Sequence, residues 1–258
     1  PAGKTYDGTQ AVSSFTTSLT GVETDDTVSV VSSAVTVVFD APGAGTQGAS
    51  ATVSSSVLTG ADAGNYAASV GTVSSAVIAK ASQGSLSFTS ASSMVFGQTL
   101  TLVATGGSGS GSVTYGATGD CTLSSGVITP TGAGSCSVTA VRVADDNFNQ
   151  SSTATQTVTI SKAAQSINFT SSVPSSAVSG TTYTPTATAS SGLTPSISVT
   201  TGSPSVCTAS GGVVTFVASG TCVITAEQDG DSDYNAASSV TQTIVAGKIN
   251  QTISFPAV

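Results

Sequence analysis

The chain has 258 residues, of which 7% are charged, and a formal net charge of −8. Five basic residues against thirteen acidic ones leave no electrostatic footprint for nucleic acid or for an anionic membrane. Histidine and tryptophan are absent, so the usual acid–base and nucleophile sets of enzymes cannot be assembled. We therefore expect that the chain is not an enzyme and that it does not bind nucleic acid. We also expect no membrane insertion, because no apolar run approaches the ~18 to 20 residues of a spanning helix.

Residues 1–80 are predicted to form a first β module without cysteine. Valines at 28–31 and again at 35–38 indicate two strands, because β-branched residues are enriched in strands. Asp40–Gly43 is a turn sequence. Val70–Ile78 is predicted to be the closing strand of this module.

Two motifs bracket the first module. Lys4–Thr9 reads Lys-x-Tyr-Asp-Gly-Thr, and Leu58–Tyr66 reads Leu-x-Gly-x-Asp-x-x-Asn-Tyr. In this order and at this separation they resemble the YDG domain of large bacterial surface proteins of the filamentous-haemagglutinin and adhesin type. The resemblance covers about a third of the chain. It implies a β-sandwich used as a spacer, and it brings no catalytic residues.

The polar and aromatic side chains of these motifs allow other interpretations. Tyr6 and Tyr66 could be exposed binding aromatics, but we expect them to pack at the core or at a sandwich corner with bonded hydroxyls. Lys4 and Asn65 form the one conceivable pair for an intramolecular Lys–Asn isopeptide bond. We do not expect that bond to form.

Lysine marks the end of each predicted module. Lys80, Lys162 and Lys248 lie at matching positions, where we expect them to keep short linkers soluble and to blunt edge pairing. Almost no linker remains between the modules, which predicts a rod of three tandem immunoglobulin-like (Ig-like) β-sandwiches in an all-β chain. The predicted parts are 1–80, 81–162 and 163–248, followed by residues 249–258 as the first strand of a further module.

A cysteine-containing segment occurs twice. Cys121 and Cys136 recur 86 positions later as Cys207 and Cys222, since 207 − 121 = 86 and 222 − 136 = 86. A fixed period of this length indicates an array of like modules. We predict the disulfides Cys121–Cys136 and Cys207–Cys222, and hence an oxidising compartment, because paired cysteines at matched spacing indicate disulfides and a zinc site would need four clustered ligands.

The second module is predicted from alternating residues and one glycine-rich loop. Ser85–Phe88, Thr99–Ala104 and the region of Val113 and Tyr115 indicate strands. Gly106–Gly111 is expected to be a flexible loop. It is no phosphate cradle, since no Gly-Lys-Ser/Thr follows it and no helix pattern supplies an N-terminus.

On the strand that begins at each second cysteine, alternate residues should share the buried face. Val138 and Ala140 are expected to face inward with Cys136, because side chains alternate across a strand with a period of two. Ile224 and Ala226 should do the same with Cys222. Each cysteine pair is therefore expected in or at the rim of a core.

The third module carries the same landmarks as the second. Gln165–Phe169 is its predicted first strand, and Tyr183–Ala187 the next. Pro185 within that strand indicates an edge or a bulge, because proline has no N–H to donate. The cysteine, glycine and Tyr-Asn-x-Ala pattern of the module looks like the bacterial Ig-like repeats of giant surface proteins. The second module departs from that pattern, with Arg142 for Gln and Phe148 for Tyr.

Three carboxylates in one turn form a candidate metal site. Asp229, Asp231 and Asp233 could offer alternate oxygens to Ca²⁺. The glycine and glutamate of a calcium-binding loop are missing at the sixth and twelfth positions, and the second module has a poorer set. We expect a solvated turn and no cofactor, with calcium as the alternative.

Taken together, these patterns predict a secreted or surface-attached bacterial stalk whose partners are neighbouring like modules. The alternatives are an adhesive module that binds a glycan or a protein on a host or cell surface, and a filament subunit joined by strand donation. Exposure of four aromatic residues should separate the first two functions: Tyr115, Phe148, Tyr183 and Tyr234. The tail Gln251–Phe255 repeats Gln165–Phe169 and should not order alone, because an isolated strand leaves its backbone unpaired.

Overall fold

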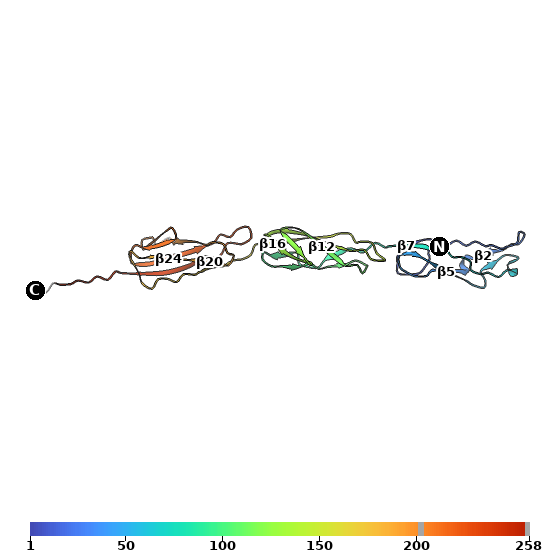
Figure 1. The fold of residues 1–258 in the computed structure, drawn as a ribbon, viewed down its shortest axis with the longest axis horizontal. Coiled ribbons are helices and arrows are strands. Elements are labelled where there is room, and N and C mark those ends of the chain that lie inside the picture. Colours follow the sequence, from blue (N-terminus) through green and yellow to red (C-terminus); the bar gives the residue numbers. More distant parts are fainter. Residues whose placement is uncertain (201–203, 256–258) are drawn as a thin grey trace. The chain divides into compact units, whose positions relative to one another are not determined.

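The computed structural model describes residues 1–200 and 204–255, and it confirms the all-β class (Figure 1). Within these ranges the helical segments are two single turns, η1 (Ser32–Ala34) and η2 (Ala63–Asn65). The chain divides into two compact units, which are described separately. Unit 1 comprises Pro1–Ser90, Thr101–Ala117 and Val138–Gln156, and unit 2 comprises Ala91–Leu100, Thr118–Ser137 and Thr157–Val258. The division into three modules stays a prediction.

The first 80 residues belong to unit 1 and form short strands. Parallel β1 and antiparallel β4 both pair with β7, β2 pairs with β6, and β3 pairs with β5. The seven strands are β1 (Lys4–Thr5), β2 (Ser29–Val30), β3 (Val35–Phe39), β4 (Gly45–Gln47), β5 (Ala49–Val53), β6 (Leu58–Thr59) and β7 (Ala76–Ala79).

The closing strand of this region is shorter than the sequence predicts. Residues 66–75 form no strand, and Val70 is 43% exposed. After Tyr66 the run has only two valines among Ala, Ser, Gly and Thr, so it offers little apolar surface to bury. Strand pairing starts only at Ala76, where Ile78 is buried opposite Lys4 and Gly45.

The rest of unit 1 contains the pair β8 (Leu86–Phe88) and β11 (Ala104–Gly106), which are antiparallel. The predicted strand Thr99–Ala104 is interrupted at Leu102 and Val103, so that β10 and β11 belong to different sheets. Four strands have residues in both units: β10 (Leu100–Thr101), β12 (Val113–Gly119), β15 (Gly134–Arg142) and β16 (Ala154–Ser161). Their sheets are ordered β10-β14-β13 and β12-β15-β16-β9.

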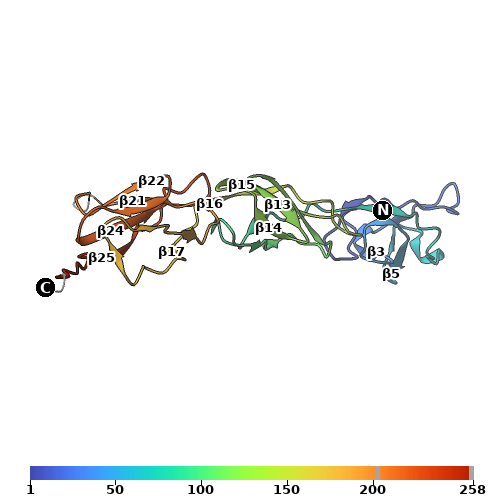
Figure 2. The same ribbon diagram turned by 60° about the vertical axis from the view of Figure 1, so that its left-hand side comes forward.

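Unit 2 contains the remaining strands. They are β9 (Ser93–Val95), β13 (Cys121–Ser124), β14 (Val127–Pro130), β17 (Ile167–Phe169), β18 (Ala177–Val178), β19 (Thr182–Tyr183), β20 (Ala187–Ala189), β21 (Ser196–Val199), β22 (Cys207–Ser210), β23 (Val213–Phe216), β24 (Gly220–Glu227) and β25 (Val240–Gly247). In residues 163–248 the sheets are β18-β25-β24-β21, β19-β23-β22 and β17-β20. β24 and β25 lie side by side over seven paired residues from Gly220 to Ala226 (Figure 2).

Two local sequence features fix these strands. Pro185 separates β19 from β20 and is itself buried, because a residue without an N–H cannot continue the ladder. The hairpins β13–β14 and β22–β23, which each begin at a cysteine, have glycine at the tip. In β22–β23 the tip residues Gly211 and Gly212 have φ angles of 58° and 78°, a region that favours glycine.

The tail is exposed in the part that the structure describes. Residues 249–255 form no strand, and Ile253 and Phe255 are 79% and 88% exposed. Their counterparts Ile167 and Phe169 lie on β17, where Ile167 is 3% exposed. Residues 256–258, the end of the predicted first strand of a further module, lie outside the described residues.

Candidate functional site

Each cysteine pair joins the edge of one sheet to the centre of another. The structure joins Cys121 of β13 to Cys136 of β15, and Cys207 of β22 to Cys222 of β24. The Cα atoms of the pairs are 5.7 and 5.8 Å apart. These are the two pairs that the 15-residue spacing predicts.

The cysteines lie inside the cores. Cys136, Val138 and Ala140 alternate along β15 and are all 0% exposed. Cys222, Ile224 and Ala226 do the same on β24, also at 0%. The period of two therefore places the sulfur and the apolar side chains on one face, as the sequence indicates.

A carboxylate-centred turn follows each of these long strands. Asp145 Oδ1 accepts hydrogen bonds from the N–H groups of Asn147 and Phe148 at 2.9 and 2.8 Å. In the second copy, Asp231 Oδ1 accepts from the N–H groups of Asp233 and Tyr234 at 2.8 and 2.9 Å. Both turns are thus closed by a side chain that satisfies two backbone donors.

Hydrogen bonds also set the charge state of the first of these carboxylates. Burial alone would raise the pKa of Asp145, but backbone N–H groups of Asn147, Phe148 and Ser110 outweigh it and lower the pKa to about 2. Asp145 Oδ2 accepts the Ser110 N–H at 2.6 Å. The turn therefore holds an ionised carboxylate.

The three carboxylates of the candidate calcium site have different surroundings. Asp231 closes its own turn, Asp233 Oδ1 accepts a hydrogen bond from the N–H of Ala133 at 2.8 Å, and Asp229 is exposed. Within residues 1–200 and 204–255, no group of three Cys, Asp or Glu side chains is placed to hold a metal. Calcium binding by Asp229, Asp231 and Asp233 stays an untested alternative.

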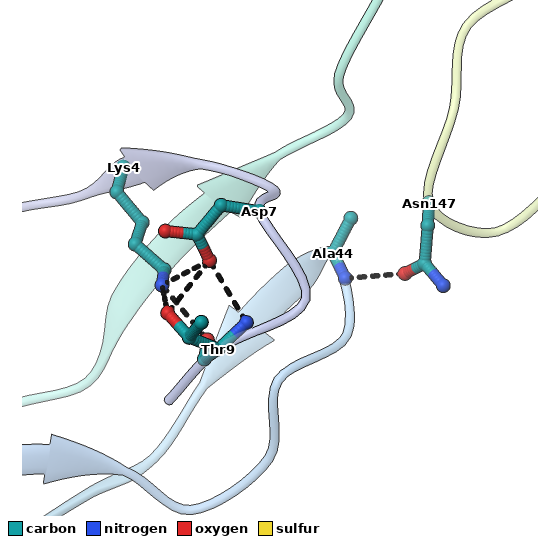
Figure 3. A network of polar contacts seen from close by, with 5 residues as sticks. All are labelled: Lys4, Asp7, Thr9, Ala44 and Asn147. Carbon is teal, nitrogen blue, oxygen red and sulfur yellow. Dashed lines mark hydrogen bonds and ion pairs between the residues drawn. The ribbon is translucent and has the colours of Figure 1, made fainter. Parts of the chain in front are cut away.

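The tips of the two turns contact residues far away in the sequence. Asn147 Oδ1 accepts a hydrogen bond from the N–H of Ala44 at 2.9 Å, within unit 1 (Figure 3). The Phe148 ring meets the Tyr6 ring edge to face, with centroids 5.3 Å apart. Within unit 2, the Tyr234 ring meets Phe96 in the same way at 5.6 Å. These geometries are favourable for aromatic pairs.

Two of the boundary lysines are engaged with these turns. Lys80 Nζ donates to the carbonyl of Asp145 at 2.6 Å, and Lys162 Nζ donates to that of Asp231 at 2.5 Å. Solubility was the role that the sequence suggested for them. The sequence could not show that each lysine binds a carbonyl more than 60 residues away.

The tyrosines of the inner strands use their hydroxyls inside the chain. The Tyr115 hydroxyl accepts the N–H of Ala104 at 3.0 Å. The Tyr183 hydroxyl donates to Gln242 Oε1 at 2.9 Å and lies 2.7 Å from Ser171 Oγ. Tyr115, Tyr183, Tyr234 and Phe148 are all half-buried. Each of the four therefore has a partner within the chain.

The two motifs of residues 1–80, here named the first domain, also make hydrogen bonds within unit 1. The Tyr66 hydroxyl donates to Asp26 Oδ2 at 2.6 Å, and this bond to a carboxylate raises the pKa of Tyr66. Lys4 Nζ donates to Asp7 Oδ1 at 2.7 Å and to both oxygens of Thr9 (Figure 3). The Lys4 hydrogen bond lowers the pKa of Asp7 to about 2. Asp7 and Thr9, and not Asn65, are the partners of Lys4.

Sequence reasoning missed the role of Arg142. Its guanidinium donates to the carbonyls of Gly106 and Gly111 at 3.0 and 2.6 Å. The loop Gly106–Gly111, expected to be flexible, is thus held at both ends. The substitution of arginine for the glutamine of the repeat pattern was the available signal, because arginine has five donors in a fixed fork.

The first domain contains a groove of about 550 Å³. Its sheet side is formed by alternate, half-buried residues of β3 and β5, namely Val35, Val37, Ala51 and Val53. Its other side is formed by the strandless segments 15–20 and 66–74. The groove holds none of the residue types needed for general acid–base chemistry apart from Tyr66.

Comparison with known proteins gives one family match. A family model of the YDG domain matches residues 1–76, which confirms the resemblance of the first domain. No curated protein matches the chain. In the described residues, the structure contains no helix with the length and apolarity to cross a membrane.

Similar solved structures include an intimin fragment in complex with its receptor's intimin-binding domain (20% identity, TM-score 0.24, covering 64% of each chain). They also include the S-layer protein rSbsC (18% identity, TM-score 0.29, covering 78% of this chain and 32% of that one). Extracellular domains 3–5 of Drosophila OTK give 10% identity and a TM-score of 0.32, with 80% of this chain and 72% of that chain covered.

Proposed function

We propose that this chain is a non-catalytic segment of the stalk or fibre of a secreted bacterial surface adhesin. In this role it projects or assembles an extracellular appendage, and its partners are neighbouring like modules. The observation that carries the proposal is the internal use of its aromatic residues. The four aromatics that should form the surface of a binder are half-buried, with hydroxyls bonded or rings paired inside the chain. The YDG match of residues 1–76 supports the same role.

The disulfides suit a protein that works outside the cell. Each clamps a core of fully buried residues, and all four cysteines are paired. Disulfides persist in oxidising compartments, where small domains use them to supplement a limited core. A location at the bacterial surface follows from this proposal.

Small-angle scattering of the oxidised chain tests the stalk function. Strands of about 20 Å plus loops give about 35 to 40 Å per module, so three modules in line should reach a maximum dimension near 100 Å or more. A compact particle would contradict a stalk. A parallel titration with glycans and surface proteins should show no saturable binding, and saturable binding would favour the adhesive alternative.

One observation favours a second candidate function, a filament subunit joined by strand donation. Ile253 and Phe255 alternate on an unpaired segment and are 79% and 88% exposed. The groove of the first domain is lined by alternate valines and could receive such a segment from a second copy. Deleting residues 249–258 separates the candidates. If the shortened chain is monomeric and its stability is unchanged, the stalk function is supported. If the intact chain forms filaments and the shortened chain does not, the filament-subunit function replaces the stalk function.

A further inference from the structure

The five-residue turns 145–149 and 231–235 make the same contacts at two places in the chain. The offset between them is constant, since 231 − 145 = 86 and 235 − 149 = 86. Their shared pattern is Asp-x-Asn/Asp-aromatic-Asn. We propose that this turn is a docking element by which each Ig-like module binds the end of the module before it. The inference rests on the proposed stalk function and names the partner of each module, which is the preceding like module.

The turn first fixes the linker that enters its own module. In unit 1, the N–H of Ala81 donates to the carbonyl of Asn147 at 2.9 Å, and the N–H of Asn149 donates back to Ala81 at 2.9 Å. The amide of Asn149 also bonds the carbonyl of Lys80 at 3.2 Å. The Lys80 ammonium also donates to the backbone carbonyl of Asp145. The linker and the turn are therefore joined by several hydrogen bonds.

Unit 2 repeats these linker contacts. The N–H of Ala163 donates to the backbone carbonyl of Asp233 at 2.8 Å, and the N–H of Asn235 donates back to the carbonyl of Ala163 at 2.9 Å. The side-chain amide of Asn235 donates to the carbonyl of Lys162 at 3.3 Å, and the Lys162 ammonium donates to the backbone carbonyl of Asp231. The same hydrogen bonds therefore recur at both linkers, although the surrounding sequences differ.

The third and fourth positions of the turn then contact the preceding module. The third position supplies a side-chain oxygen, which is Asn147 Oδ1 on the N–H of Ala44 and Asp233 Oδ1 on the N–H of Ala133. The fourth position supplies a ring, which meets Tyr6 in the first case and Phe96 in the second. One hydrogen bond and one ring pair therefore hold each docked turn.

The receiving surface is also the same in both cases. Ala44 and Ala133 each precede a glycine of positive φ, 124° at Gly45 and 154° at Gly134, that begins a strand. Those strands, β4 and β15, each neighbour the last strand of their module, β7 or β16. Equivalent backbone positions thus present the N–H group at both ends.

The receiving aromatic also has one structural position. Tyr6 directly follows β1, which runs parallel to β7, and its N–H bonds the carbonyl of Ala79 at 2.8 Å. Phe96 directly follows β9, which runs parallel to β16, and its N–H bonds the carbonyl of Ser161 at 2.9 Å. The surface that accepts a turn is therefore set by the fold, with an aromatic residue at a fixed place.

Amide hydrogen exchange of the full oxidised chain tests the docking at each receiving N–H. Asn147→Ala should accelerate exchange of the Ala44 amide about three- to tenfold and leave the Ala133 amide unchanged, because one hydrogen bond of ordinary net strength is lost. Asp233→Ala should do the reverse, with at least as large an effect, since its hydrogen bond involves a charged acceptor. Asp146→Ala and Ser232→Ala alter exposed residues of the same turns and should change neither amide.

Three outcomes would overturn the docking: rapid exchange of both amides in the unaltered chain, no acceleration in Asn147→Ala and Asp233→Ala, or equal acceleration in the two control variants. Exchange at Cys136 and Cys222, inside the cores, reports whether a variant has unfolded. The stalk function fails on a different result, a compact particle in scattering. An extended particle with unprotected Ala44 and Ala133 amides would refute the docking and leave the stalk standing.

Discussion

The first domain and residues 163–248 have similar lengths but very different cores. In residues 1–80 the buried hydrophobic side chains are Phe39, Val57 and Ile78. Within the described part of 163–248 the corresponding set is Ile167, Ala177, Cys207, Val214, Phe216, Cys222, Ile224, Ala226, Ile244 and Ala246. The inward valines of β3 and β5 instead line a groove of about 550 Å³.

The region that contains the Cys207–Cys222 disulfide also has the longer strands and the larger buried core. The long strands β24 and β25 bring many apolar residues together around Cys207–Cys222. The first domain has shorter strands and leaves 66–75 without strand structure. Alternating valines are present in both regions, so the pattern alone does not decide how tightly a sandwich closes. The predictions below test the contrast, from the largest expected effect to the smallest.

The largest effect should come from the disulfides. Replacing both Cys207 and Cys222 with alanine should lower the free energy of unfolding of residues 163–248 by about 3 kcal/mol, because the 15-residue loop is no longer closed in the unfolded chain. Native-state amide exchange at the buried Ile224, followed at increasing urea concentration, measures it. Unfolding of residues 1–80, followed by amide exchange at Ile78, should be unaffected by the replacement or by a reductant. An equal loss in both regions would show that they unfold as one.

A matched pair of valines sharpens the comparison. Val214→Ala removes a side chain that is 1% exposed and should cost about 2 to 3 kcal/mol of unfolding free energy. Val37→Ala removes a half-buried side chain at the groove and should cost less than about 1 kcal/mol. Regional unfolding free energies from native-state amide exchange give both values. Similar losses of unfolding free energy for the two variants would mean that the core of residues 1–80 is as closed as the core of residues 163–248.

Enlarging an alanine should have opposite signs in the two regions. Ala226 is 0% exposed, so Ala226→Val should overpack the third core and cost about 1 to 3 kcal/mol. Ala51 borders the groove, so Ala51→Val should stabilise the first domain by about 0.5 to 1 kcal/mol. Thermal unfolding of the two variants against the unaltered chain gives the signs. Destabilisation by Ala51→Val would show that the groove is closed in solution.

The smallest effect concerns acid. The pKa of Asp145 is lowered to about 2, below its ordinary 3.8, so its contribution to the turn is fully present above pH 3.8. That contribution is lost as the pH falls through about 2. The amide signals of Asn147 and Phe148, followed by NMR from pH 5 to pH 1.5, should shift with a midpoint near 2. In Asp145→Asn this titration should vanish, and its persistence would assign it to another group.

The sequence predicted well whatever depends on local pattern. The cysteine spacing and the alternation around Cys136 and Cys222 led to the observed pairs and to the residues buried beside them. The hydrogen-bonded Tyr66 hydroxyl agrees with the expectation, drawn from the tyrosine corner of β-sandwiches, that this hydroxyl is bonded inside the chain. Pro185 correctly indicated an edge position, since β19 and β20 both lie at sheet edges, but the single predicted strand Tyr183–Ala187 is broken there into two.

What the sequence could not show depends on residues far apart in the chain. Asn147 meets Ala44, and Asp233 meets Ala133, about 100 positions away. Nothing in a local pattern distinguishes such an acceptor from a solvated turn residue. The predicted strand Val70–Ile78 was too long because alternation was read into a segment with few large apolar side chains. The repeat pattern marks Arg142 only as a departure, whereas its contacts with the Gly106 and Gly111 carbonyls anchor a loop.

Stretching the single molecule tests most directly the central claim of an array of separate modules, two of which are clamped by a disulfide. Pulled from its two ends, the oxidised chain should unfold in three force peaks. After reduction two of the three contour-length steps should each lengthen by about 50 Å, because the bonded cysteines are 15 positions apart and each position spans about 3.3 to 3.6 Å of extended chain. A single cooperative peak, or three steps that reduction leaves unchanged, would contradict the account.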